Sequence, residues 1–182
     1  MLIRKFTTML VSLACLAIPV SYVVTANAAR QEETKTDTVL KAADISAKIF
    51  PETVFYAGKV APVQMRNTGG LHFADGPYVV AGLVDTAGYA TGLKEKYQGY
   101  LLTEVSLEIN GQSLKAGAYG IGFVADSKFI VSDVGGHNLL EIAGQRDTVL
   151  KRATPLQVVT APEAGAYRLY LGRNFVTIKR AH

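Results

Sequence analysis

From residue 53 onward the chain repeats one pattern, in which short β-branched and aromatic runs alternate with Gly, Asn and Asp. Close spacing of such runs is typical of antiparallel strands joined by tight turns. The clearest case is the pair Asn110-Gly111, the preferred dipeptide for a two-residue type I′ turn, because both residues tolerate left-handed backbone. Before this pair, apolar and polar residues alternate over residues 100–109, as in a strand with one buried face. The sequence therefore predicts an all-β fold, either a single antiparallel β-sandwich or a small β-barrel.

The predicted strands share this composition and are bounded by turn residues. They cover residues 54–56, 63–66, 71–73, 78–84, 100–109, 118–125, 128–134, 139–143, 156–160, 167–171 and 175–179. The four residues from Asn67 to Gly70 are predicted to form a turn between two of these strands. Residues 100–134 are predicted to form a three-stranded meander. Its glycines, Gly120 and Gly122, indicate bulges, barrel bends or close contact with another backbone.

The front of the chain has a different composition. Arg4 and Lys5 precede an apolar run over residues 10–24, and Ala26 and Ala28 follow it at the two positions that a signal peptidase reads. A charged start, an apolar middle and a small-residue end predict a cleavable secretory signal over residues 1–28. We therefore expect an exported protein, either periplasmic or extracellular.

Two alternatives for this segment stay open. A membrane anchor is disfavoured because the apolar run is shorter than the roughly 20 residues that span a bilayer. A lipoprotein signal would cut before Cys15, but Ser12 stands where a large aliphatic residue is usual, and the residues after Cys15 stay apolar. Cys15 is the only cysteine, so cleavage after Ala28 would leave no disulfide, thiol nucleophile or thiolate ligand.

Cleavage would also change the charge. Of the 19 Lys and Arg residues, Arg4 and Lys5 lie in the signal, so 17 would face 15 Asp and Glu, a net charge of +2. The remaining charges are interspersed, and no basic cluster contains the aromatic residues that favour nucleic-acid binding. We expect no nucleic-acid partner and no stable membrane span after cleavage.

The predicted organisation after the signal is a flexible polar spacer over residues 29–44 and one all-β domain over residues 45–182. Residues 39–50 favour a short helix that ends at Pro51, with a strand over residues 45–50 as the alternative.

The most open feature is a long segment, residues 85–98, which shows no strand alternation. Long loops in small domains are often functional, and tyrosine combines apolar area with a polar tip. Three tyrosines gather around this segment. Tyr89, Tyr97 and Tyr100 are therefore the candidate ligand-binding residues, with ordinary strand packing as the alternative.

Candidates for a metal site or for acid–base chemistry are few. His72 lies near Asp75, and His137 lies near Asp133, but their spacing does not match a metal-binding motif on one helix or strand. The sequence contains no Gly-x-Ser-x-Gly nucleophile elbow. The run from Gly117 to Gly122 lacks the strand-then-helix context and the Lys-Ser/Thr of a phosphate loop. We expect no catalytic residue, no metal and no cofactor.

Two stretches resemble uncharacterised secreted bacterial β-sandwich domains. One runs from Ile109 to Tyr119 and has a glycine turn followed by a Leu-x-x-Gly-x-Tyr phrase. The other is the closing strand over residues 167–173. Where those domains usually have proline before the glycine, this chain has Ala116. The resemblance implies export and a β-sandwich, and it assigns no functional residue.

Two functions follow as hypotheses. The first is an exported, non-enzymatic protein that binds a small apolar ligand or an envelope protein. The second is a secreted hydrolase or metal-dependent enzyme that uses His72 or His137 with Asp75 or Asp133. The composition leaves the oligomeric state and the identity of the ligand open.

Overall fold

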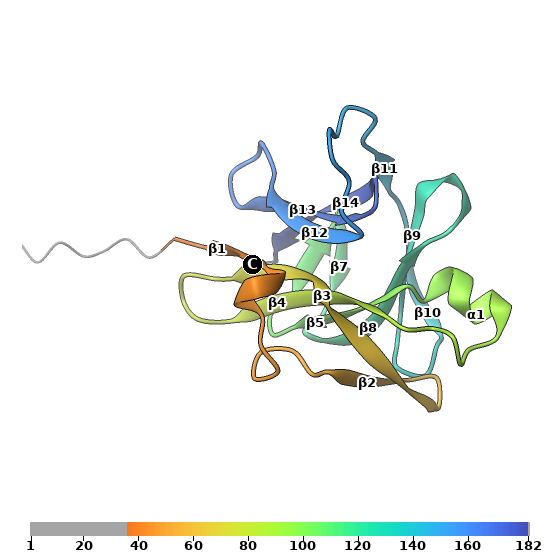
Figure 1. Cartoon of the computed structure of the whole chain (residues 1–182). Helices are drawn as coiled ribbons and strands as arrows, with labels where there is room; N and C mark the ends of the chain where they lie inside the picture. The colour runs from red at the N-terminus through yellow and green to blue at the C-terminus, as the bar shows by residue number, and fades with distance from the viewer. Residues whose placement is uncertain (1–35, 182) are drawn as a thin grey trace, which may run out of the picture. The chain divides into compact units, whose positions relative to one another are not determined.

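The structure is a computed structural model that describes residues 36–181. The predicted signal peptide and residues 29–35 of the predicted spacer lie outside these residues. Within them, the chain forms strands with three short helical turns (Figure 1). The strands are β1 (Thr38–Lys41), β2 (Thr53–Tyr56), β3 (Lys59–His72), β4 (Tyr78–Val84), β5 (Gly99–Thr103), β6 (Leu107–Ile109), β7 (Gln112–Leu114), β8 (Gly117–Phe123), β9 (Lys128–Ser132), β10 (Asn138–Ala143), β11 (Gln145–Arg146), β12 (Leu156–Thr160), β13 (Ala166–Leu171) and β14 (Asn174–Arg180). The helical turns are the 3-10 turns Ala42–Asp44 and Ala125–Ser127, and α1 (Thr91–Lys96).

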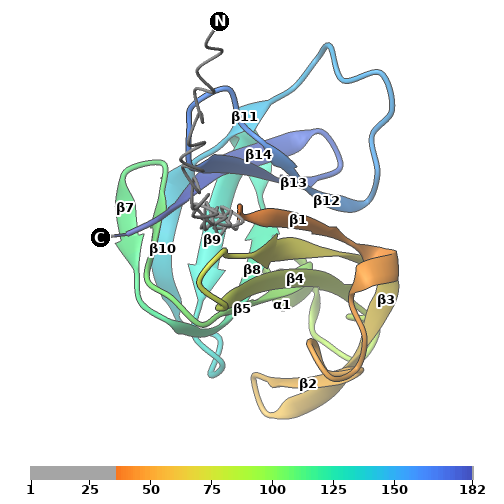
Figure 2. The ribbon, with the colours of Figure 1, turned by 90° about the vertical axis from the view of Figure 1, so that its left-hand side faces the viewer.

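Two antiparallel sheets pack against each other in the described residues, which confirms the predicted all-β fold. The first sheet has eight strands in the order β1-β3-β4-β5-β8-β9-β10, with β2 paired to β3. The second has six strands in the order β12-β13-β14-β6-β7, with β11 paired to β14. Figure 2 shows β12, β13 and β14 of the second sheet above the strands β1, β3 and β4 of the first. The arrangement is a β-sandwich.

The first sheet is covered on both faces. One face packs against the second sheet through a core that includes Leu101, Ile121, Val131, Leu169 and Val176. The other face packs against a second cluster, formed by the β2–β3 hairpin and by the segments on either side of α1. The buried residues of this second cluster are Leu40, Ile45, Phe50, Val54, Tyr56, Ala61, Val63, Val80, Val84, Tyr89, Tyr97 and Tyr100.

The hairpin at Asn110-Gly111 is confirmed, with positive φ angles of 44° and 86° at the two residues. The prediction of one continuous strand over residues 100–109 is wrong. The chain forms β5 in the first sheet and β6 in the second, and it changes sheet over residues 104–106. The Thr103 hydroxyl donates a hydrogen bond to the Val105 carbonyl and accepts one from the Val105 N–H. These bonds interrupt the β5 ladder, although the alternation of apolar residues continues through the break.

The predicted turn from Asn67 to Gly70 is also wrong, because these residues lie inside the long strand β3. The strand carries a register shift between Val63 and Thr68, where the Thr68 hydroxyl donates to the Met65 carbonyl at 2.7 Å. The glycines allow close packing instead of a reversal of the chain. A Cβ atom on Gly69 would lie 3.2 Å from the backbone nitrogen of Val158 in β12.

The ordered sheet begins earlier than predicted. Residues 38–41, which the sequence placed in a flexible spacer or in a helix, form β1 and pair with β3. The predicted helix over residues 39–50 is reduced to the 3-10 turn Ala42–Asp44. The burial of Leu40 against the second cluster provides the reason for this pairing, since a strand buries Leu40 while its neighbours stay accessible.

Candidate functional site

The tyrosines around residues 85–98 lie in the second cluster. Tyr97 is fully buried, and its ring stacks on the ring of Tyr56 with centroids 3.7 Å apart. Tyr89 meets Tyr97 edge-on at 5.4 Å, whereas Tyr100 packs against Phe50 at 6.4 Å. The structure thus brings Tyr89 and Tyr97 together around Tyr56, as side chains that fill a core.

The hydroxyl groups of this cluster differ in their partners. The Tyr56 hydroxyl lies 2.6 Å from the Ser132 hydroxyl, and the Tyr89 hydroxyl donates to the Tyr56 carbonyl at 3.0 Å. The Tyr97 hydroxyl has no hydrogen-bond partner among residues 36–181. Burial raises the pKa of Tyr97 far above its ordinary value, and it also raises the pKa of Tyr56 and Tyr89. These phenols therefore stay neutral at ordinary pH.

The two candidate histidines, His72 and His137, contact different residues. The His72 ring stacks on Tyr78 with centroids 4.2 Å apart. The Nδ1 atom of His137 lies 3.1 Å from an Asp133 carboxylate oxygen, and the imidazole is 82% exposed. The backbone N–H of His137, followed by its imidazole, lowers the pKa of the Asp133 carboxyl. An exposed pair of this kind gains little from charge attraction.

The fourth candidate metal ligand, Asp75, is engaged elsewhere. Its carboxylate accepts two hydrogen bonds from the Arg180 guanidinium, at 2.7 and 2.8 Å, which lower the pKa of the carboxyl. Over residues 36–181, no three His, Cys, Asp or Glu side chains converge in a way that could hold a metal ion.

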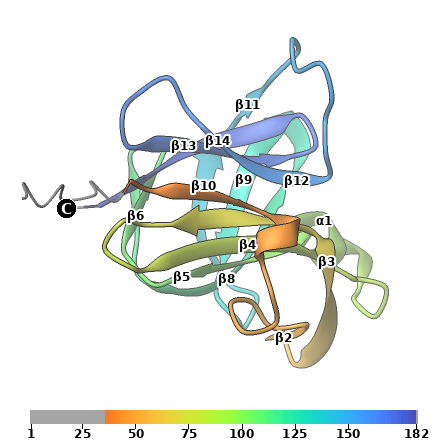
Figure 3. The same cartoon turned by 60° about the vertical axis from the view of Figure 1, so that its left-hand side comes forward.

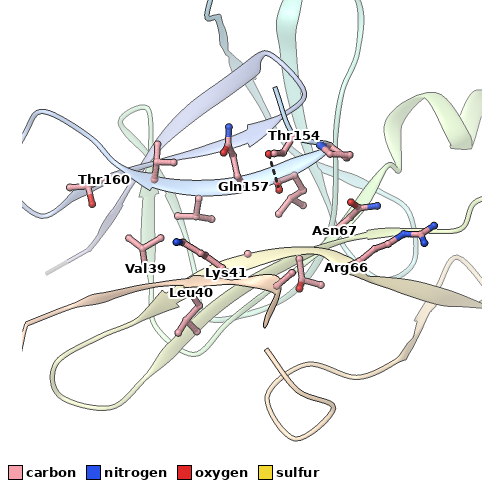
Figure 4. A pocket seen from close by; sticks show the side chains of 15 residues that line it. Val39, Leu40, Lys41, Arg66, Asn67, Thr154, Gln157 and Thr160 are labelled. Carbon is pink, nitrogen blue, oxygen red and sulfur yellow. Dashed lines mark hydrogen bonds between the residues drawn. The ribbon is translucent and has the colours of Figure 1, made fainter. Parts of the chain in front are cut away.

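A groove of about 540 Å³ opens between the first strand of each sheet, β1 and β12, over the adjoining part of β3 (Figure 4). Figure 3 shows β1 running between β12 and β13 on one side and β3 and β4 on the other. The lining residues come from three segments: Val39 to Ala42, Arg66 to Gly69, and Thr154 to Thr160. We call this opening the β1–β12 groove.

The floor and walls of the β1–β12 groove are mostly apolar. Val39 points from β1 toward β12, whereas Leu40 points away into the second cluster (Figure 4). From the opposite side, Leu156 and Val158 are buried in the core between the sheets. Gly69 completes the floor, because its missing side chain lets β12 cross β3 in close contact.

The backbone edge of β1 faces away from its sheet. The Lys41 N–H donates to the Asp44 carboxylate at 2.9 Å and not to β3. In an antiparallel ladder the hydrogen-bonding direction alternates along the strand. The polar backbone groups of Val39 and Lys41 therefore point away from β3.

Along β12 the hydrogen-bonding direction of the backbone also alternates from residue to residue. The Gly172 N–H donates to the Pro155 carbonyl, and the Ala161 N–H donates to the Ala166 carbonyl. These bonds define the alternation of the β12–β13 ladder. The residues whose polar backbone groups point away from β13 are Leu156, Val158 and Thr160. The β1–β12 groove is therefore bounded by two sheet edges, which are sites where proteins accept an additional partner.

Polar side chains surround the apolar floor. Lys41 extends between β1 and β12, and Arg66 lies at the β3 end of the groove (Figure 4). Asn67 and Gln157 also line it, and the Thr154 hydroxyl donates to the Leu156 carbonyl at 3.4 Å. The lining contains these two cations and no Asp or Glu.

Sequence reasoning missed the β1–β12 groove. Its residues come from the predicted spacer, from the predicted turn at Asn67–Gly70, and from the start of a strand that had no functional signal. A groove between two sheet edges depends on which strands are first in each sheet, and that order is not written in the local pattern. The one local signal was Gly69, a glycine inside a stretch of strand-like residues.

Searches of family models, of curated proteins and of solved structures found no match to this chain. Among the described residues, no helix has the length and apolar character needed to cross a membrane.

Proposed function

We propose that this chain is an exported, non-enzymatic binding protein that holds a small apolar molecule in the β1–β12 groove. Export rests on the signal-like composition of residues 1–28. The observation that supports the site is the volume of about 540 Å³ over a mainly apolar lining. Small-molecule sites are usually of this size, with apolar walls and a few polar groups that fix the orientation of the ligand.

The position of the groove supports the same proposal. It lies where two rigid sheets meet, so both walls are held by ladders and by the core between the sheets. A preformed apolar recess loses little conformational entropy when a ligand enters it. The Tyr56–Tyr97 stack offers no comparable opening, because both rings are fully buried.

Titration with N-phenyl-1-naphthylamine, a neutral apolar dye that fluoresces when it leaves water, tests this function. We expect saturable binding of one dye per chain. The substitution Val39→Trp places an indole in the groove and should weaken dye binding at least about tenfold, or about 1.4 kcal/mol. The Thr160→Trp variant serves as a second block, since Thr160 is exposed and lines the same groove.

The matched control is Val60→Trp, which makes the same change at an exposed position of the β2–β3 hairpin. Its dye affinity should equal that of the parent chain. If the parent chain binds no dye, or if both groove variants that keep the far-ultraviolet circular dichroism of the parent bind it equally well, the proposed function is wrong.

A further inference from the structure

The charges around the β1–β12 groove are unbalanced. Lys41 and Arg66 line it, and the lining contains no Asp or Glu. Neither cation pairs with a carboxylate in the described part of the chain. Elsewhere the pairs Lys128–Glu141 and Lys179–Glu163 do form, at 3.2 and 2.6 Å.

Lys41 is an exposed cation that lines the groove from β1. Figure 4 shows its side chain between β1 and β12, beside Val39 and below Gln157. Asp44 follows closely in sequence, but one of its carboxylate oxygens accepts the Lys41 backbone N–H at 2.9 Å. The Lys41 ammonium therefore keeps its donors free for a bound molecule, next to an apolar wall.

An anion close to this ammonium would complete the site. A hydrogen bond between an ammonium and a carboxylate is stronger than one between neutral groups, and apolar surroundings strengthen it further. Arg66, at the far end of the groove, adds positive potential that favours the same sign of charge. An apolar molecule without charge would leave Lys41 next to it unpaired.

We propose that the ligand of the β1–β12 groove is a free anionic amphiphile, with an apolar body over Val39 and Val158 and a carboxylate or similar group on Lys41. This inference rests on the proposed function. It specifies a free molecule and not a lipid in a bilayer, because the site is a recess between strands. Asn67, Thr154 and Gln157 also line it.

A pair of dyes with the same aromatic body tests the charge. N-phenyl-1-naphthylamine is neutral, and 8-anilinonaphthalene-1-sulfonate adds one sulfonate. We expect the full chain to bind the sulfonate about tenfold more tightly than the neutral dye at low salt. Lys41→Gln should remove most of this preference, so that the affinities for the two dyes become nearly equal. Dodecanoate should displace both dyes at lower concentration than dodecanol.

The control variant is Lys115→Gln, which removes an equal charge next to β7. That strand lies at the opposite end of the second sheet from β12. The Lys115→Gln variant should keep the preference for the sulfonate dye. Added salt should reduce this preference in every chain that retains Lys41.

The outcomes separate the two proposals. Equal binding of both dyes, with no effect of Lys41→Gln on either, overturns the anionic ligand and leaves the apolar groove standing. Binding of neither dye overturns both. Flotation of the protein with phosphatidylglycerol vesicles, without binding of dodecanoate, would assign Lys41 to a membrane surface and contradict a free amphiphile.

Discussion

The Tyr97 hydroxyl in the second cluster is a buried polar group that lacks a hydrogen bond within the described part of the chain. The Tyr97 ring, by contrast, is stacked on the Tyr56 ring. A buried polar group without a hydrogen bond costs roughly 1–3 kcal/mol of stability. The hydroxyl of Tyr56 is different, because it lies 2.6 Å from the Ser132 hydroxyl.

Tyr97→Phe should therefore raise the free energy of unfolding by about 1 kcal/mol, since it removes the unpaired group and keeps the ring. Tyr56→Phe is the matched control and should lower the free energy of unfolding by about 1 kcal/mol, because it breaks a hydrogen bond. Urea unfolding measures both. A Tyr97→Phe variant that is less stable than the parent chain would show that the hydroxyl has a partner, such as a buried water.

Alkaline pH gives a second readout on the same variant. Because burial raises the pKa of Tyr97, the folded chain keeps this proton at a pH where the unfolded chain loses it. The unfolded state then binds fewer protons, so stability falls as pH rises above about 10. In Tyr97→Phe this decline should be shallower by about 1.4 kcal/mol per pH unit.

At the scale of elements, the turn between β6 and β7 does more than reverse the chain. The Asn110 side-chain amide donates to the Ala143 carbonyl at 2.8 Å. Its carbonyl oxygen accepts the Thr177 N–H, also at 2.8 Å. A single turn residue therefore joins the hairpin to the end of β10 and to the middle of β14.

Asn110→Ala should lower the free energy of unfolding by about 2–3 kcal/mol, because it loses both hydrogen bonds and because alanine tolerates the positive φ less well than asparagine. Asn110→Gly keeps the backbone freedom and should lose only the part due to the side chain, about 1–2 kcal/mol. The urea midpoints of the two variants check this difference. Equal costs for the two would mean that the positive φ at position 110 costs alanine nothing.

Local pattern predicted the elements better than their pairing. The strands over residues 78–84 and 156–160 have the predicted bounds, and the turn at Asn110 was expected from its dipeptide. The glycines of β8 also behave as one of the predicted alternatives. A Cβ on Gly122 would lie 2.8 Å from the carbonyl carbon of Lys96, which is a close contact with another backbone.

The errors arose where tertiary contacts override the pattern. Residues 100–109 alternate as one strand, but the chain changes sheet after Thr103 because side-chain and backbone bonds interrupt the ladder. Residues 38–41 look like part of a polar spacer until β3 is present to pair with them. Ligand binding and ordinary packing were both open for the tyrosines around residues 85–98, and the structure packs Tyr97 in the second cluster.

At the scale of the whole molecule, the candidate site exists because two sheets end side by side. β1 and β12 are the outer strands of their sheets, and their meeting leaves the β1–β12 groove between two unpaired edges. A site of this kind requires both sheets at once, so a pattern within one segment could not reveal it. The three segments that line it are distant in sequence and are joined only by the sandwich.

The most direct test of the proposed function is to locate a bound ligand by nuclear magnetic resonance. The chain is labelled with nitrogen-15 and titrated with N-phenyl-1-naphthylamine while the backbone amide signals are followed. Binding in the β1–β12 groove predicts saturable shifts at Val39, Lys41, Val158 and Thr160, with little change at Tyr97. Shifts concentrated on residues 85–100 around Tyr97, or the absence of saturable shifts, would contradict the account.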